Sequence, residues 1–161
     1  MFDKKNSKIY SVESARPRLE KYCAYQERSQ KQAYDKCRSL GLNDEDANLL
    51  LVELIRSNFL NEERFVSAYI KGKFKLKNWG KQKIIQGLKL AGVPIKLINN
   101  QLNEIGVEDY SETIKKLAEK KFKLVKGDTE FERQIKVKRF LLSKGYSLDD
   151  IQKVLKSEDY L

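Results

Sequence analysis

The chain of 161 residues contains no histidine, and this absence excludes several kinds of functional site. Imidazole is the usual base of nucleophilic catalysis and a frequent ligand of zinc, so both chemistries lack their ordinary partner here. The two cysteines, Cys23 and Cys37, lie 14 positions apart and form no CxxC pair. We therefore expect two small buried residues rather than a disulfide or a metal site, in a reduced, cytoplasmic protein.

Turn-forming residues and long apolar runs are also scarce. Two prolines and eight glycines leave too few turn signals for a many-stranded β fold. The longest uncharged apolar run, around residues 47–52, is far shorter than the ~20 residues that span a bilayer. No apolar core of a secretory signal occurs in residues 1–21. We expect no membrane partner.

Charge is abundant but uneven. The chain carries 33 Lys+Arg against 23 Asp+Glu, a net charge of +10. Residues 1–61 are nearly balanced, with 11 basic and 9 acidic side chains, whereas residues 64–103 contain no acid at all. Solvated lysines that cluster by chance remain one interpretation. The length of the acid-free window favours an anionic partner, either phosphates or an acidic protein groove.

Apolar residues recur at helical spacing along nearly the whole chain. In residues 62–76 this spacing predicts one face with Phe65, Ala68 and Tyr69. We expect core positions, without a binding role, at Phe65, Tyr69, Ile84 and Leu88. Alternating strand patterns are absent apart from the short Lys-Xaa-Lys stretch at 71–77, and helical segments flank it.

A helix–glycine–helix pattern occurs three times. Aligned on Gly41, Gly92 and Gly145, the three segments are 51 and 53 residues apart, and apolar or small residues recur eight and four positions before each glycine and six and ten after it. Glycine is the residue that best adopts the positive φ found just past a helix end. A helix starter follows two residues later in each segment, namely Asn43, Pro94 or Ser147.

One further helix precedes each pair, over residues 18–27, 62–75 and 112–124. The sequence therefore predicts an all-α fold of three tandem three-helix repeats that form an elongated, curved body. We place a flexible basic N-terminal arm at 1–16, repeat 1 at 17–60, repeat 2 at 61–108 and repeat 3 at 109–161.

Two stretches carry a resemblance to a known family. The first is NFLNEERFVSAYIKGKFKLKNWGKQKIIQGLKLAGV, residues 58–93, and the second is KVKRFLLSKGYSLDDIQKVL, residues 136–155. Both resemble signature segments of the RecX family of bacterial recombination regulators, and residues 23–60 resemble its first repeat more weakly. Two features depart from the family pattern. Gly87 lies inside a helix, where glycine costs about 1 kcal/mol relative to alanine, and Asn78-Trp79-Gly80-Lys81 replaces a Gly-x-Gly-Pro turn.

The resemblance implies three three-helix repeats and a regulatory role. Proteins of this family bind RecA recombinase filaments in the helical groove and suppress RecA's ATPase, strand exchange and coprotease activities. They thereby modulate recombination, DNA repair and the SOS response. Some members also bind DNA directly. The implied partners are a RecA filament and single- or double-stranded DNA, with the protein acting as a monomer.

The best contact candidates are basic residues and the single tryptophan. They are Lys71, Lys73, Lys75, Lys77, Trp79, Lys81 and Lys83 in the middle of the chain, and Lys136, Lys138 and Arg139 near its end. Trp79 could cover a helix interface, anchor a partner or stack on a base, and the sequence leaves these open. For Arg64, a local ion pair and a partner contact both remain open.

The sequence shows no catalytic constellation, phosphate-binding loop or dinucleotide motif. We expect no enzyme activity, no cofactor and no metal site. Two functions remain: regulation of RecA filaments, implied by the resemblance, and a stand-alone basic helical module that binds DNA or RNA, suggested by the charge. The second predicts tight, salt-sensitive nucleic-acid binding without RecA.

Overall fold

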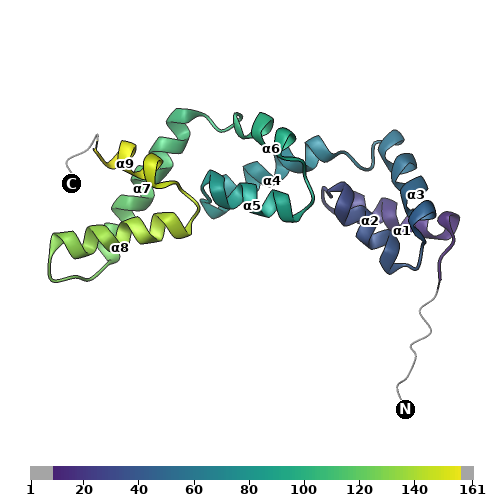
Figure 1. The fold of residues 1–161 in the computed structure, drawn as a ribbon, viewed down its shortest axis with the longest axis horizontal. Helices are drawn as coiled ribbons and strands as arrows, with labels where there is room; N and C mark the ends of the chain where they lie inside the picture. Colours follow the sequence, from purple (N-terminus) through teal and green to yellow (C-terminus); the bar gives the residue numbers. More distant parts are fainter. Residues whose placement is uncertain (1–8, 157–161) are drawn as a thin grey trace, which may run out of the picture. The chain divides into compact units, whose positions relative to one another are not determined.

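The computed structural model describes residues 9–156, and this part of the chain is helical with short connections and no strand. The helices are α1 (Val12–Tyr25), α2 (Gln30–Ser39), α3 (Asp44–Arg56), α4 (Glu62–Lys77), α5 (Lys81–Leu90), α6 (Ile95–Leu102), α7 (Val107–Leu124), α8 (Glu130–Ser143) and α9 (Leu148–Lys156) (Figure 1). This arrangement confirms the predicted all-α fold.

The chain divides into two compact units. Unit 1 comprises the residues up to Ala68 together with Leu88–Leu97, and unit 2 comprises Tyr69–Gly87 together with the residues from Ile98 onward. Helices α4 and α5 therefore each contribute to both units. The repeat boundaries at residues 60 and 108 stay predictions.

The three glycines of the repeat end their helices as predicted. Gly41, Gly92 and Gly145 have φ of 90°, 79° and 97°. In each case the next residue donates its N–H to the carbonyl five residues earlier: Leu42 to Cys37 at 3.3 Å, Val93 to Leu88 at 3.1 Å and Tyr146 to Leu141 at 3.2 Å. This bond is the mark of a Schellman ending, which only a left-handed residue before the donor permits.

The helix starts also follow the sequence. Asn43 and Ser147 accept hydrogen bonds from the N–H groups of Asp46 and Asp150, at 2.8 and 3.1 Å. All the apolar repeat positions before and after the three glycines are buried. The repeated pattern in the sequence therefore corresponds to buried core positions and helix caps in the structure.

The first helix begins earlier than predicted. Ser11 and Ser14 form a capping box that starts α1 at Val12, so the segment expected to be an arm contributes to the fold from Tyr10 onward. The Tyr10 N–H donates to the Leu40 carbonyl at 3.1 Å. The predicted start relied on apolar periodicity and overlooked the cap. Two serines three positions apart satisfy the first N–H groups of a helix without any apolar pattern. Residues 1–8 lie outside the described part of the chain.

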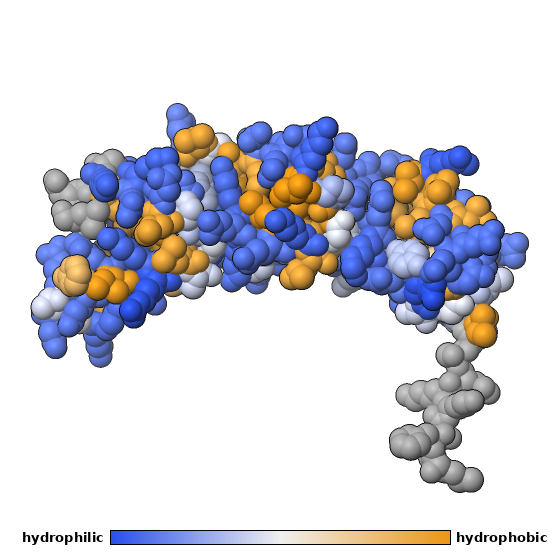
Figure 2. Space-filling view, in the orientation of Figure 1, coloured by the Kyte–Doolittle hydropathy of each residue, from blue (hydrophilic) through white to orange (hydrophobic). Residues whose placement is uncertain are grey.

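The core of unit 1 lies where α1, α2 and α3 pack pairwise. Its fully buried side chains include Leu19, Ala33, Leu50 and Leu54. Cys23 and Cys37 are buried free thiols, as predicted, and burial raises the pKa of Cys37 to about 11. Figure 2 shows apolar atoms over α3, where Leu49, Val52 and Ile55 remain exposed.

Unit 2 has its own core, in which α7, α8 and α9 pack pairwise. Three aromatic rings meet in it: Phe74 and Tyr110 have ring centroids 6.0 Å apart, and Tyr110 and Tyr146 have centroids 5.3 Å apart. Tyr146 is fully buried. Its position beside Tyr110 ties the second half of α4 to the helices near the end of the chain.

One predicted helix face was partly wrong. In α4 the buried side chains are Phe65, Val66, Ile70 and Phe74, whereas Ala68 is exposed and Tyr69 is half-buried. Residues 66, 70 and 74 are at helical spacing, as are residues 65, 68 and 69 of the predicted face, so periodicity alone does not distinguish the two faces. Ala68 could not separate the two, because a methyl group gains little free energy from burial.

Candidate functional site

The lysine-rich middle of the acid-free stretch lies in unit 2. It covers the second half of α4, the turn 78–80 and the first turn of α5, and we call the residues Lys71, Lys73, Lys75, Lys77, Trp79, Lys81 and Lys83 the α4–α5 basic surface. None of its lysines forms an ion pair within the described part of the chain. Its positive charge is therefore not neutralised by direct contact with carboxylates.

The turn between α4 and α5 is fixed by a left-handed asparagine. Asn78 has φ of 54° and its N–H donates to the Phe74 carbonyl at 3.1 Å. Asparagine tolerates this conformation better than other side chains, so it replaces the glycine that the resemblance led us to expect. Lys81, at the expected proline position, uses its N–H to donate to the Tyr110 hydroxyl at 3.0 Å.

This turn is docked on the α8–α9 turn. The Gly80 N–H donates to the Lys144 carbonyl at 2.8 Å, and the Gln82 N–H donates to the Gly145 carbonyl at 3.0 Å. The buried Tyr146 hydroxyl donates to the Asn78 carbonyl at 2.9 Å. Burial raises the pKa of Tyr146, so this phenol stays protonated and remains a donor. These three bonds hold the turn 78–80 and the start of α5 against the α8–α9 turn.

Two ammonium groups lie close to the Trp79 ring. The Lys73 Nζ is 4.7 Å from the centre of the indole ring, and the Lys83 Nζ is 4.6 Å from it. Lys73 is also 5.3 Å from the centre of the Tyr69 ring. Trp79 is half-buried. The cation–π contacts hold both lysines against the ring, so Trp79 contributes to the arrangement of charge on this surface.

The remaining lysines of the surface differ in their surroundings. Lys71, Lys75 and Lys77 are exposed. Lys71 and Lys75 border a small pocket of about 110 Å³ that Glu104 and Asp109 also line. Lys77 is exposed without bordering that pocket, so a single substitution there changes mainly the surface charge.

The second predicted cluster lies on α8. Lys136 and Arg139 are exposed, and Lys138 is half-buried. The Lys136 ammonium donates to the Lys126 carbonyl, in the loop between α7 and α8. Arg139 has no contact that links it to the α4–α5 basic surface among the described residues. Of the first predicted cluster, the structure brings Lys73 and Lys83 together at Trp79. The second cluster lies in the middle of α8.

Arg64 contacts other residues of the chain. Its Nε donates to Glu27 at 2.8 Å, and its terminal nitrogens donate to the Asn58 side chain at 2.9 Å and the Asn58 carbonyl at 3.1 Å. Asn58 itself has φ of 63°. The structure shows an ion pair within the chain, but its partner Glu27 lies 37 positions earlier, so the pair fastens the start of α4 to the connection between α1 and α2.

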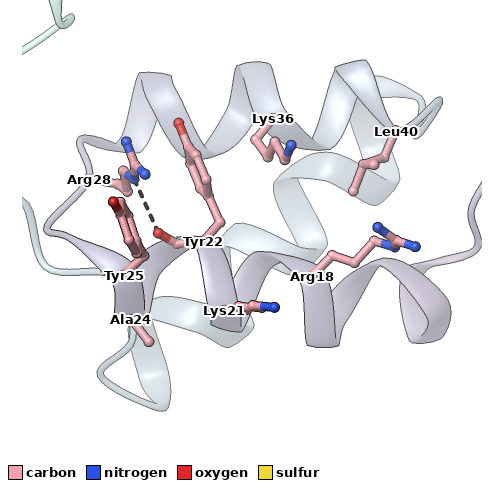
Figure 3. A pocket seen from close by; sticks show the side chains of 8 residues that line it. All are labelled: Arg18, Lys21, Tyr22, Ala24, Tyr25, Arg28, Lys36 and Leu40. Carbon is pink, nitrogen blue, oxygen red and sulfur yellow. Dashed lines mark hydrogen bonds between the residues drawn. The ribbon is translucent and has the colours of Figure 1, made fainter.

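Unit 1 contains a pocket that the sequence did not predict, and Figure 3 shows the side chains that line it. We call it the α1–α2 pocket, with a volume of about 510 Å³ and the lining Arg18, Lys21, Tyr22, Ala24, Tyr25, Arg28, Lys36 and Leu40. The nearly balanced charge of residues 1–61 concealed it. A signal was present, because residues 18, 21, 22 and 25 share one helix face at i, i+3, i+4 and i+7.

Neither a metal site nor a membrane span emerges from residues 9–156. No three metal-binding side chains gather there. No helix in that part of the chain combines the length and the apolar character needed to cross a bilayer.

Comparison with known proteins gives two family-level matches. Residues 61–102 match the family model for the second three-helix domain of RecX, and residues 108–155 match the one for its third three-helix domain. These ranges hold the α4–α5 basic surface and the α8 cluster. The α1–α2 pocket lies outside both.

Several relatives carry the name "Regulatory protein RecX". One from Clostridium tetani is 32% identical over 130 residues, which are 80% of this chain and 59% of that protein. One from Clostridium perfringens strain 13 is 33% identical over 124 residues, 76% of this chain and 58% of that protein. One from Bacillus licheniformis is 30% identical over 139 residues, 86% of this chain and 53% of that protein. The chain thus spans less than two thirds of the length of these relatives.

Solved structures support the fold. The crystal structure of RecX from Lactobacillus salivarius superposes with a TM-score of 0.85 at 24% identity, covering 93% of this chain and 97% of that one. A second structure, described as regulatory protein RecX, has a TM-score of 0.82 at 24% identity and covers 91% of this chain and 73% of that one.

Proposed function

The chain belongs to the RecX family of regulatory proteins, and on this premise we propose that it binds RecA–DNA filaments and inhibits their activity. The inhibited activities are RecA's ATPase, strand exchange and coprotease functions, so the protein modulates recombination and DNA repair. It acts as a monomer without cofactor or catalysis. The observation that carries this proposal is the match of two consecutive three-helix domains to the family, over the residues that form the α4–α5 basic surface.

The charge of that surface supports the proposal. Its six lysines have no ion-pair partner among the described residues, and three of them are exposed. A RecA–DNA filament offers a polyanion together with a protein groove, and unneutralised lysines raise the local attraction to both. The α8 cluster adds a second point of contact. Two weak contacts on one chain reinforce each other, because the second binds at the high effective concentration that the first creates.

The first test is the ATP hydrolysis of the cognate RecA on single-stranded DNA, measured while this protein is titrated from far below to equal the RecA concentration. We expect inhibition. Inhibition at substoichiometric ratios favours capping or disassembly of filaments, and inhibition only near saturation favours coating of the groove. Unchanged hydrolysis at a stoichiometric excess would refute the proposal. Tight salt-sensitive DNA binding in that case would favour a stand-alone nucleic-acid-binding module.

A pair of charge-reversal variants tests the surface. Lys75→Glu/Lys77→Glu changes two exposed lysines of the α4–α5 basic surface, and we expect it to weaken inhibition by about ten-fold or more. Lys120→Glu/Lys123→Glu changes two exposed lysines of α7 and alters the net charge equally. If both pairs weaken inhibition to the same extent, the net charge matters and the surface has no special role.

A further inference from the structure

The α1–α2 pocket has the composition of a nucleotide-binding site. Four of its eight lining residues are cations, two are tyrosines, and no carboxylate of the described residues lines it. Its volume of about 510 Å³ falls within the roughly 300–1,000 Å³ range of small-ligand sites. Nucleotides combine a flat π face with a phosphate, and these are the two groups that aromatic rings and clustered cations bind.

The cations come from both helices and are held in place. Arg18 and Lys21 lie on α1, Lys36 lies on α2, and Arg28 lies in the connection between them. The Arg28 Nε donates to the Tyr22 carbonyl at 3.1 Å, and its guanidinium lies 3.8 Å from the centre of the Tyr22 ring. Lys36 Nζ is 5.5 Å from the same centre. Tyr22 therefore orders two of the four charges before any ligand arrives.

The acids near this region are engaged elsewhere. Glu20 pairs with Arg16 at 3.2 Å, Glu27 with Arg64 at 2.8 Å, and Asp35 with Lys31. Their carboxylates are thus drawn to neighbouring faces of unit 1 by basic residues outside the pocket. This separation of charge leaves the pocket positive although residues 1–61 are nearly neutral as a whole.

The second tyrosine of the pocket, Tyr25, differs from Tyr22 in its exposure to solvent. It is the last residue of α1 and is 82% exposed, so its ring is open to solvent. Figure 3 shows Tyr22, Tyr25 and Arg28 gathered toward one end of the pocket, while Arg18, Lys36 and Leu40 lie toward the other. A base that stacks on Tyr25 therefore lies beside Arg28, and the chain of phosphates next to it runs toward Arg18 and Lys36 at the other end of the pocket.

We infer that the α1–α2 pocket binds single-stranded nucleic acid, with one base stacked on Tyr25 and adjacent phosphates held by Arg18, Lys21, Arg28 and Lys36. The inference goes beyond the proposed regulation of RecA, because it concerns unit 1 alone and requires no filament. A strand suits the site better than an acidic protein segment, since carboxylates would use the cations and leave the exposed ring without a partner.

The test is the binding of a fluorescein-labelled oligothymidylate to the full chain without RecA, followed by anisotropy over a series of salt concentrations. We expect Tyr25→Ala to weaken binding about five-fold or more, because stacking on an aromatic ring contributes roughly 1–3 kcal/mol per base. Tyr25→Phe keeps the ring and should restore wild-type affinity. We expect Lys21→Gln to lower the slope of log K against log salt by about 0.7.

Lys31→Gln provides the matched control for charge. Lys31 is an exposed lysine of unit 1 that pairs with Asp35 outside the pocket. We expect the salt slope of this variant to equal that of the wild type. A Lys31→Gln effect as large as the Lys21→Gln effect, or Tyr25→Ala binding equal to wild type, would overturn the inference.

Cross-linking locates the strand directly. After ultraviolet irradiation of a complex with an iodouracil-substituted strand, we expect mass spectrometry to find adducts on Tyr25 or Tyr22. Adducts confined to Trp79 would overturn the inference and place the strand on the α4–α5 basic surface. Competition by free thymidine monophosphate at the affinity of the strand would also overturn it, because the site would then take a free nucleotide. If polyglutamate binds with the same affinity as the strand, and Tyr25→Ala does not change that affinity, the ligand would be an acidic protein segment instead.

The failures of the two proposals can be told apart. If the Tyr25→Ala variant no longer binds the strand but still inhibits RecA, the result supports the pocket as a strand-binding site and leaves the regulatory function intact. Strand binding that responds to Tyr25→Ala while RecA hydrolysis stays unchanged supports the pocket alone.

Discussion

Replacing Gly80 by alanine should break the docking of the α4–α5 turn on the α8–α9 turn. A Cβ at position 80 would lie 2.4 Å from the carbonyl carbon and oxygen of Gly145 and from the N atom of Tyr146. These are backbone atoms, which cannot rotate away as the end of a side chain can. Ordinary van der Waals contacts are about 3.5–4.0 Å, so the two turns must separate by an ångström or more.

The cost can be worked out from the bonds that this separation breaks. The hydrogen bonds from Gly80 to Lys144 and from Gln82 to Gly145, at 2.8 and 3.0 Å, would both lengthen. A net hydrogen bond contributes about 0.5–1.5 kcal/mol, and a buried group left unpaired adds its desolvation penalty. We expect Gly80→Ala to lower the free energy of unfolding by about 2–4 kcal/mol, which is large for a single methyl group.

The assay is urea unfolding followed by the fluorescence of Trp79, the only tryptophan, and by far-ultraviolet circular dichroism. With a slope of about 2 kcal/mol per molar urea, the expected shift of the midpoint is about 1–2 M. Gly72→Ala is the control, because a Cβ at position 72 of α4 meets nothing within 4 Å. That variant should gain about 1 kcal/mol from helix propensity. A Gly80→Ala midpoint at or above that of the wild type would refute the close backbone contact.

Three further predictions concern single groups. Asn78→Ala should lower the free energy of unfolding by about 1–2 kcal/mol while Asn78→Gly does not, because φ is 54° at this position. The measurement is the midpoint of urea unfolding, and equal midpoints for the two variants would contradict the reasoning. Burial raises the pKa of Tyr110 to about 12 and that of Tyr146 above its ordinary value. The folded state therefore holds these protons more tightly than the unfolded chain, whose tyrosines have a pKa of about 10. The free energy of unfolding should be constant below about pH 9 and fall as the pH rises through 10, and the fall should be smaller in Tyr146→Phe. Melting temperatures that stay constant up to about pH 11 would contradict this pH dependence. Burial also raises the pKa of the Cys37 thiol to about 11, so a thiol-specific reagent should label it only after unfolding, and rapid labelling of the native protein would show that it is accessible.

The position of Gly87 shows how tertiary packing explains an unfavourable residue. Glycine inside α5 weakens the helix by about 1 kcal/mol relative to alanine. A Cβ there would lie 1.9 Å from the Tyr69 hydroxyl oxygen, so glycine makes room for that ring against α5. Burial raises the pKa of Tyr69, in agreement with this packing. Propensity alone marked the residue as a departure, and only the structure supplies its reason.

The sequence by itself determined the local architecture of this protein. Gly41, Gly92 and Gly145, with their flanking caps and apolar positions, specify three helix–turn–helix segments, because backbone conformation and capping depend on residues within one or two turns. The same local signals fixed the buried state of Cys23 and Cys37 and the basic character of residues 71–83.

Only the tertiary structure decided which distant residues share a surface. It brought Lys73 and Lys83 close to the ring of Trp79 and docked the turn at Gly80 on the turn at Gly145. It also placed Lys36 of α2 in the same pocket as Arg18 of α1. These pairings depend on how helices pack against one another, and the packing follows from side-chain shape summed over whole interfaces. A count of charges along the chain therefore located the α4–α5 basic surface and overlooked the α1–α2 pocket, whose cations are gathered only when the two helices come together.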